Sequence, residues 1–151
     1  MSHKALSGHF LQQAEALAES LRRRDPIGVM SDVPNVRRGG ERLNVLFVCS
    51  RNQWRSPTGE QVWRRDPRVN VRSTGTSAGA RRVVSAADLA WADVVLVMEE
   101  KHKSRLLAEH RALLQHKPLH VLDVPDDYRY MDPELVALLG DPVAALLGLE
   151  R

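Results

Sequence analysis

A cysteine, an arginine and a Ser-Pro pair lie within nine residues of one another, in an order suited to phosphate chemistry. The segment reads CSRNQWRSP from Cys49 to Pro57. Five residues between the cysteine and the arginine can curl into a loop whose backbone N–H groups point inward and bind an anion. Arg55 offers a planar fork for two phosphate oxygens. A thiol held in such a loop is expected to be ionised at neutral pH, which makes Cys49 a candidate nucleophile.

The residues after the loop predict a helix start. Ser56 is a good N-cap residue and Pro57 suits the first helical position, so the positive helix end would add to the anion site. Taken singly, these residues have ordinary explanations, such as a buried small thiol or a surface arginine. Their combination after an apolar run favours a phosphate-binding loop. Its expected phosphate-contacting residues are Ser50, Arg51, Asn52, Gln53, Trp54 and Ser56.

The elements around the loop predict an α/β fold. Residues 43–49 form a nearly continuous apolar run, typical of a strand buried on both faces. Further strands are expected at 69–73, 93–98 and 119–122, and helices at 57–65, 85–91 and 99–115, the second of these with Ser85 as N-cap and Asp88 completing a capping box. This alternation predicts a small, doubly wound parallel sheet of four strands with helices on both faces. Ligands bind such sheets beyond the carboxyl ends of the strands, which is where Cys49 lies.

The first 42 residues are expected to form a separate N-terminal extension. Residues 4–24 show apolar positions at three- and four-residue spacing and predict an amphipathic helix. Residues 25–42 are rich in proline and glycine and predict a linker. The chain is therefore divided into an extension, 1–42, and an α/β domain, 43–151. A docking arm, a dimerisation helix and a disordered leader all remain open for the extension.

Composition restricts the remaining chemistry. One cysteine among 151 residues excludes an internal disulfide and a cysteine-cluster metal site. No run of eighteen apolar residues is present, and the N-terminus lacks a secretory signal pattern, so we expect a cytoplasmic protein. Pro118 interrupts the spacing of His116 and His120, and the other histidines are expected on the solvated surface. Neither a metal nor another cofactor is expected.

A phosphate-transferring cysteine needs a second group that protonates the leaving oxygen. Residues 123–134 follow a predicted strand and contain four aspartates. Asp132 precedes Pro-Glu and predicts a helix cap, and Asp123 ends the strand. Asp126 and Asp127 remain as candidate acids. The same loop contains two tyrosines that could wall an aromatic pocket or simply pack the loop, Tyr128 and Tyr130.

The loop resembles the C-x5-R-[ST] signature of the low-molecular-weight protein tyrosine phosphatase family. Residues 73–76, STGT, resemble the S-A-G-T that follows the family's second strand. Residues 92–99 resemble its A-D-x4-M-[DE] third strand, and residues 126–128, DDY, resemble its D-P-[YFW] acid loop. The resemblance covers about 43–139 and is closest to a compact bacterial branch of predicted phosphatases.

The resemblance implies a cysteine-dependent phosphomonoesterase that forms a phosphocysteine intermediate. Cys49 would attack phosphorus while Arg55 and the loop amides hold the phosphoryl oxygens. Asp126 would act first as the acid and then as the base. Ser56 would hydrogen-bond the thiolate, and Asn52 would stabilise strained loop backbone. The implied substrate is a phosphotyrosine protein or a small aryl phosphate.

Three positions depart from the family pattern. Arg51 replaces a common glycine, Trp54 replaces a common second cysteine, and Asp127 replaces the proline of the acid loop. Trp54 could stack on a flat substrate or pack under the loop as part of the core. The departures leave the physiological phosphoester open.

Other functions are weighed against this interpretation. Arsenate reductases of the thiol-relay type share the implied fold but need further cysteines, which this chain lacks. A non-catalytic module that binds phosphorylated ligands would use the same loop. Residues 43–82 carry eight arginines against two acidic residues, so a phosphatase linked to nucleic acid is a further alternative. The arginines outside the loop that suggest it are Arg64, Arg65, Arg68, Arg72, Arg81 and Arg82.

Overall fold

A computed structural model describes residues 42–150, and the expected N-terminal helix and nearly all of the linker lie outside the described residues. Four parallel strands form one sheet in the order β2-β1-β3-β4. They are β1 Leu43–Cys49, β2 Val69–Gly75, β3 Val94–Val97 and β4 Leu119–Val121. This confirms the predicted parallel sheet, with β2 two residues longer than expected and β3 and β4 shorter.

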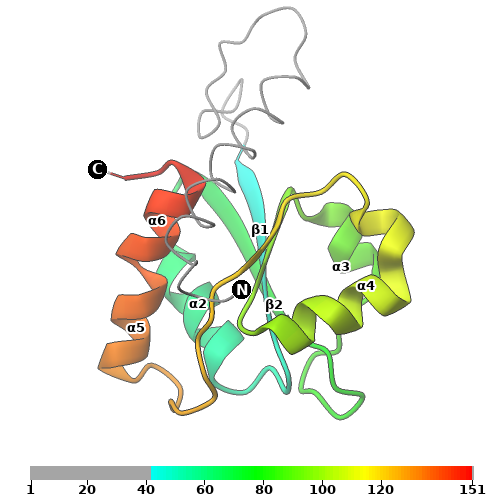
Figure 1. Cartoon of the computed structure of the whole chain (residues 1–151). Helices are drawn as coiled ribbons and strands as arrows, with labels where there is room; N and C mark the ends of the chain where they lie inside the picture. The colour runs from blue at the N-terminus through cyan, green and yellow to red at the C-terminus, as the bar shows by residue number, and fades with distance from the viewer. Residues whose placement is uncertain (1–41, 151) are drawn as a thin grey trace, which may run out of the picture.

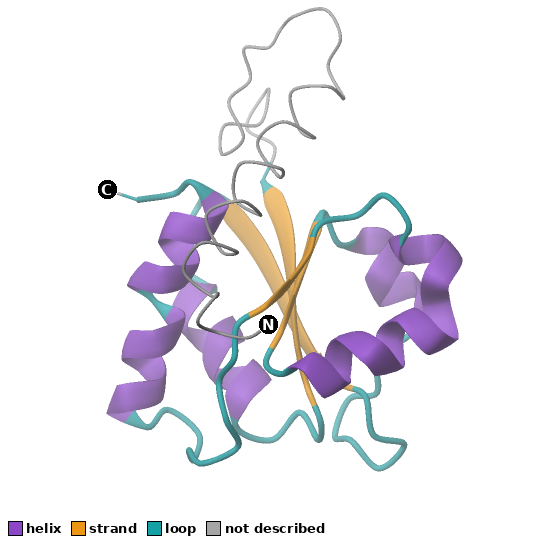
Figure 2. Ribbon diagram, viewed as in Figure 1, coloured by secondary structure: helices purple, strands orange, loops and turns teal. Residues whose placement is uncertain are grey.

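Helices cover both faces of the sheet, as predicted (Figure 1). They are α2 Arg55–Trp63, α3 Ala86–Trp91, α4 Glu100–Leu114, α5 Pro133–Leu139 and α6 Asp141–Leu147. Helices α2, α5 and α6 lie on one face, and α3 and α4 lie on the other (Figure 2). No helix within residues 42–150 is long and apolar enough to cross a membrane.

The core consists of two apolar clusters separated by the sheet. Alternate side chains of a strand point to opposite faces, so Val45 and Phe47 join the cluster under α2, α5 and α6. Leu46 and Val48 join the cluster under α3 and α4. Because β1 is central and covered on both sides, its sequence is apolar at every position except Asn44.

Two of the three predicted helix caps are confirmed and one is wrong. Ser85 caps α3 in a capping box with Asp88, and Asp132 caps α5 by accepting a hydrogen bond from the Glu134 N–H. Helix α2 begins at Arg55, two residues earlier than predicted, so Ser56 lies inside the helix instead of capping it. The hydroxyl of Ser56 instead contacts Cys49 and the Thr74 carbonyl.

Candidate active site

The loop between β1 and α2 lies at the carboxyl edge of the sheet, beside the end of β2. Backbone hydrogen bonds join this loop to the segment that follows β2. The backbone N–H groups of Thr76 and Ser77 each donate at 2.9 Å, to the carbonyls of Cys49 and Ser50 respectively. The Arg81 N–H donates to the Arg51 carbonyl at 3.0 Å. These bonds fix the loop backbone from the first residue onward.

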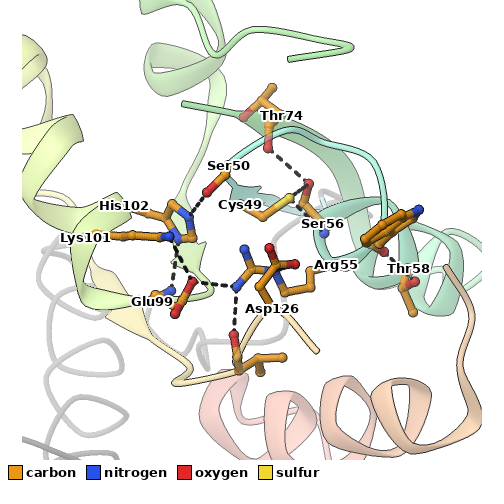
Figure 3. Close-up of polar contacts among 12 residues, drawn as sticks. Cys49, Ser50, Arg55, Ser56, Thr58, Thr74, Glu99, Lys101, His102 and Asp126 are labelled. Carbon is orange, nitrogen blue, oxygen red and sulfur yellow. Dashed lines mark hydrogen bonds and ion pairs between the residues drawn. The ribbon is translucent and has the colours of Figure 1, made fainter. Parts of the chain in front are cut away.

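Cys49 ends β1 with only 3% of its surface exposed and contacts Ser56 (Figure 3). Its Sγ lies 3.0 Å from Ser56 Oγ and accepts the Ser56 N–H at 3.4 Å. Ser56 Oγ is also 3.0 Å from the Thr74 carbonyl, to which it can donate. A neutral thiol can donate to Ser56 Oγ. A thiolate can only accept, so Ser56 must donate its single hydroxyl hydrogen to Cys49. The hydrogen bond from Ser56 to the Thr74 carbonyl is then lost.

Through its side chain, Asn52 links the loop to helix α2 and strand β2. It is fully buried, with a left-handed φ of 55°, a conformation that asparagine tolerates better than most residues. Its Nδ2 donates to Ser56 Oγ at 2.9 Å and to Ser73 Oγ at 3.0 Å. The Ser73 hydroxyl in turn donates to Glu60 at 2.5 Å. Asn52 is therefore the left-handed residue of the loop, and its hydrogen bonds run through Ser73 to Glu60, a residue that no sequence motif marks.

Arg55 is 2% exposed and is oriented by groups from two other segments. Its Nη1 donates to Glu99 Oε1 at 2.7 Å and to the Val124 carbonyl at 2.9 Å. Burial opposes ionisation of Glu99, but the hydrogen bond and charge of Arg55 outweigh it and hold the pKa of that carboxyl below its usual value. Arg55 Nε also lies 3.6 Å from Asp126 Oδ1.

One small cavity brings the predicted residues together. It is lined by Cys49, Ser50, Arg51, Gln53, Trp54, Arg55 and Asp126. Asn52 and Ser56 are buried and do not line the cavity, but Ser56 contacts Cys49, which does. The Asp126 side chain is 58% exposed, so its carboxylate borders the open side of the cavity. Asp127 is exposed and lies outside the lining.

The aromatic residues are placed differently from one another. Trp54 is 37% exposed, and the Arg129 guanidinium lies 5.6 Å from its ring centroid. It therefore stands at the rim and does not pack under the loop. Tyr128 packs partly buried against the core, and Tyr130 is exposed. Neither tyrosine lines the cavity around Cys49.

The expectation that the remaining histidines lie on the solvated surface is wrong for His102. His102 is 1% exposed. Its Nδ1 accepts the Glu99 N–H at 3.0 Å, which leaves Nε2 to donate to Ser50 Oγ at 2.8 Å. Burial and the charge of Arg55 lower the pKa of His102 to about 4, so the ring is neutral. The Glu99-x-x-His102 spacing forms a capping box on α4, and that local signal could have revealed both residues.

Most arginines outside the loop have partners within the chain. Arg68 pairs with Asp66 at 2.8 Å, and Arg72 and Arg82 both pair with Asp88. Arg81 Nε donates to the Asn52 carbonyl at 3.0 Å. These arginines therefore contact acidic and carbonyl groups of the fold itself, and Arg81 also contacts the loop that follows Cys49.

No family model and no curated protein matches the chain by sequence. Solved structures match its fold. The tyrosine phosphatase Wzb from Escherichia coli, solved with phosphate, is 21% identical, covers 72% of this chain and 98% of its own, and has a TM-score of 0.59. A low-molecular-weight phosphotyrosine phosphatase from Vibrio cholerae is 24% identical over 70% of this chain and 95% of its own, with a TM-score of 0.57.

A third similar structure is the YwlE arginine phosphatase from Geobacillus stearothermophilus. It is 20% identical over 71% of this chain and 89% of its own, with a TM-score of 0.54. A YwlE variant with serine in place of cysteine carries a phosphorylated active-site serine. With its four-stranded parallel sheet and the loop between β1 and α2, the chain described here has the fold of the low-molecular-weight protein tyrosine phosphatases.

Proposed function

We propose that the protein is a cysteine-dependent phosphomonoesterase that works through a phosphocysteine intermediate. The observation that carries this proposal is that Cys49, Arg55 and Asp126 border one cavity. A nucleophile, a fixed cation and an exposed carboxylate are the three groups that this reaction needs. The phosphorylated serine of the YwlE variant supports a covalent route on this fold.

In the first step, the Cys49 thiolate attacks phosphorus and the bond from phosphorus to the ester oxygen breaks. The Arg55 guanidinium and the loop N–H groups stabilise the charge on the three non-reacting oxygens. The leaving oxygen takes a proton from Asp126, so an alcohol or phenol departs. Because Asp126 is exposed at the cavity mouth, it can reach an oxygen that points toward solvent.

In the second step, water attacks the phosphocysteine, and Asp126 accepts its proton. The sulfur–phosphorus bond breaks, inorganic phosphate is released and Cys49 leaves as a thiolate. Two groups hydrogen-bond that sulfur, the Ser56 hydroxyl at 3.0 Å and the Ser56 N–H at 3.4 Å. These two hydrogen bonds stabilise the negative charge on sulfur and make the thiolate a better leaving group.

A phosphotyrosine protein or a small aryl phosphate is the substrate class that we infer. The exposed ring of Trp54 borders the cavity and offers a flat apolar face to an aromatic leaving group. YwlE is an arginine phosphatase, so a phosphoarginine peptide is the comparison substrate that tests this assignment. A reduced catalytic thiol also fits a reducing compartment, and we place the activity in the cytoplasm.

Turnover of an aryl phosphate by wild type and by Cys49→Ser tests the proposal. We expect the variant to lose turnover while it still binds inorganic phosphate in a titration, because Arg55 and the loop amides are unchanged. Activity of the variant near that of wild type would contradict the nucleophile assignment. Phosphate binding by a wild type without turnover would identify a non-catalytic module instead.

A further inference from the structure

A second cavity of about 260 Å³ adjoins the phosphate loop and has no role in the reaction derived above. It lies between α4 and the turn after β2. Its polar lining comprises Ser50, Thr76, Ser77, Lys101, His102 and Arg105, and no carboxylate lines it. Ser50 lines both this cavity and the one around Cys49, so the two spaces are neighbours.

The charge lining this second cavity is positive, because its two charged side chains are Lys101 and Arg105. Lys101 and Arg105 are four residues apart on α4, so they lie on the same face of the helix and repel each other. Lys101 is the second residue of α4, in the first turn, where the helix dipole disfavours cations. His102 adds no further positive charge, because its buried ring is neutral.

Both cations have a carboxylate neighbour, but neither carboxylate lines the cavity. Glu99 Oε1 lies 3.7 Å from Lys101 Nζ, but it already accepts the shorter bond of Arg55 at 2.7 Å. Arg105 pairs with Glu109 at 2.7 Å on the exposed surface of the helix. Exposed pairs of this kind contribute little and exchange readily for another anion.

We propose that this cavity is a specificity subsite that binds a second acidic group of the substrate while its phosphoryl group occupies the loop. The inference rests on the proposed phosphatase function and names its preferred substrate class, a phosphopeptide with an acidic side chain next to the phosphorylated residue. Lys101 and Arg105 bind the carboxylate, and the hydroxyls of Thr76 and Ser77 can donate further hydrogen bonds to it. Lys101 and His102 lie beside Ser50, on the side of the loop away from Thr58 (Figure 3).

This subsite can be tested with two phosphotyrosine peptides. One has Glu on both sides of the phosphotyrosine and the other has Gln at the same two positions. For wild type we expect a kcat/KM about fivefold higher with the Glu peptide at low salt, a preference that added salt reduces. In the Lys101→Gln/Arg105→Gln double variant the preference should disappear, while turnover of a simple aryl phosphate stays unchanged. The matched control is Lys103→Gln/Arg111→Gln, which removes the same charge from α4 outside the cavity and should keep the preference.

Equilibrium binding of both peptides to the Cys49→Ser variant separates this inference from the proposed function. Tighter binding of the Glu peptide that depends on Lys101 and Arg105 supports the subsite even where wild type shows no turnover. Equal affinities and equal rates for the two peptides would overturn the subsite while aryl-phosphate turnover leaves the phosphatase intact. An equal loss of preference in the test and control variants would also overturn it, because only general charge would then matter.

Discussion

Glu99 Oε1 lies 2.7 Å from Arg55 Nη1, and this ion pair fixes the direction of a guanidinium that is almost wholly buried. Glu99→Ala should lower kcat/KM for an aryl phosphate at least tenfold, because Arg55 loses the charged acceptor that orients it. It should also lower the free energy of unfolding by about 1–3 kcal/mol. Glu99→Gln should recover much of the activity, since its amide oxygen can accept the same hydrogen bond. Steady-state kinetics and urea unfolding measure both effects, with the exposed neighbour Glu100→Ala as control.

Asp126→Asn should lower kcat by about 10²–10⁴, the usual range for loss of a general acid. Asp126 borders the cavity and Asp127 does not, so Asp127→Asn should have a much smaller effect. The loss at Asp126 should shrink for substrates whose leaving group is already acidic, because such groups need little protonation. Measuring kcat with two leaving groups checks this. A larger, leaving-group-sensitive loss at Asp127 would move the acid by one residue.

Gly75 and Gly79 provide a matched pair for the backbone support of the loop. A Cβ at Gly75 would lie 2.5 Å from the Ser50 carbonyl oxygen and 2.9 Å from the Asn52 backbone nitrogen. Gly75→Ala should therefore displace the loop, cost about 1–3 kcal/mol of stability and weaken phosphate binding. A Cβ at Gly79 would meet nothing within 4 Å, so Gly79→Ala should leave both unchanged. Calorimetric phosphate titration and thermal unfolding of the two variants compare them directly.

His102 should make stability depend on pH. Its pKa is about 4 in the folded protein and about 6.5 when unfolded, so between these values the unfolded chain binds the extra proton. Stability from the neutral ring is fully present above pH 6.5 and is lost as the pH falls toward 4, by up to about 3 kcal/mol. His102→Gln has no such titration, and Gln can still accept from the Glu99 N–H and donate to Ser50.

Urea unfolding of wild type and His102→Gln at pH 7, 5.5 and 4.5 measures this difference. The wild type should lose more stability than the variant over that range. An equal loss in both proteins would show that His102 is not the titrating group. The catalytic pH profile between 6 and 8 should be the same for both proteins, because His102 is neutral throughout that range.

Local sequence patterns were sufficient where the physical cause is local. The nearly continuous apolar run of β1 predicted its bounds, because a strand covered on both faces has apolar residues at almost every position. Ser85 and Asp132 were identified as caps, since capping is a bond between residues two or three positions apart. Ser56 was misassigned because its hydroxyl contacts Cys49 and Thr74 instead, seven and eighteen residues away.

The sequence by itself determined strand β1, the loop between Cys49 and Arg55 and the parallel α/β fold. All three follow from short-range residue spacing and from the pattern of apolar residues. Only the tertiary structure decided which distant residues support that loop. Glu99 and His102 reach it because the sheet order places β3 directly beside β1, so the chain beyond β3 meets the end of β1. The basic cavity next to Ser50 arises from the same placement. Residue spacing carries no record of which strands become neighbours, since that choice is made by packing across the whole sheet.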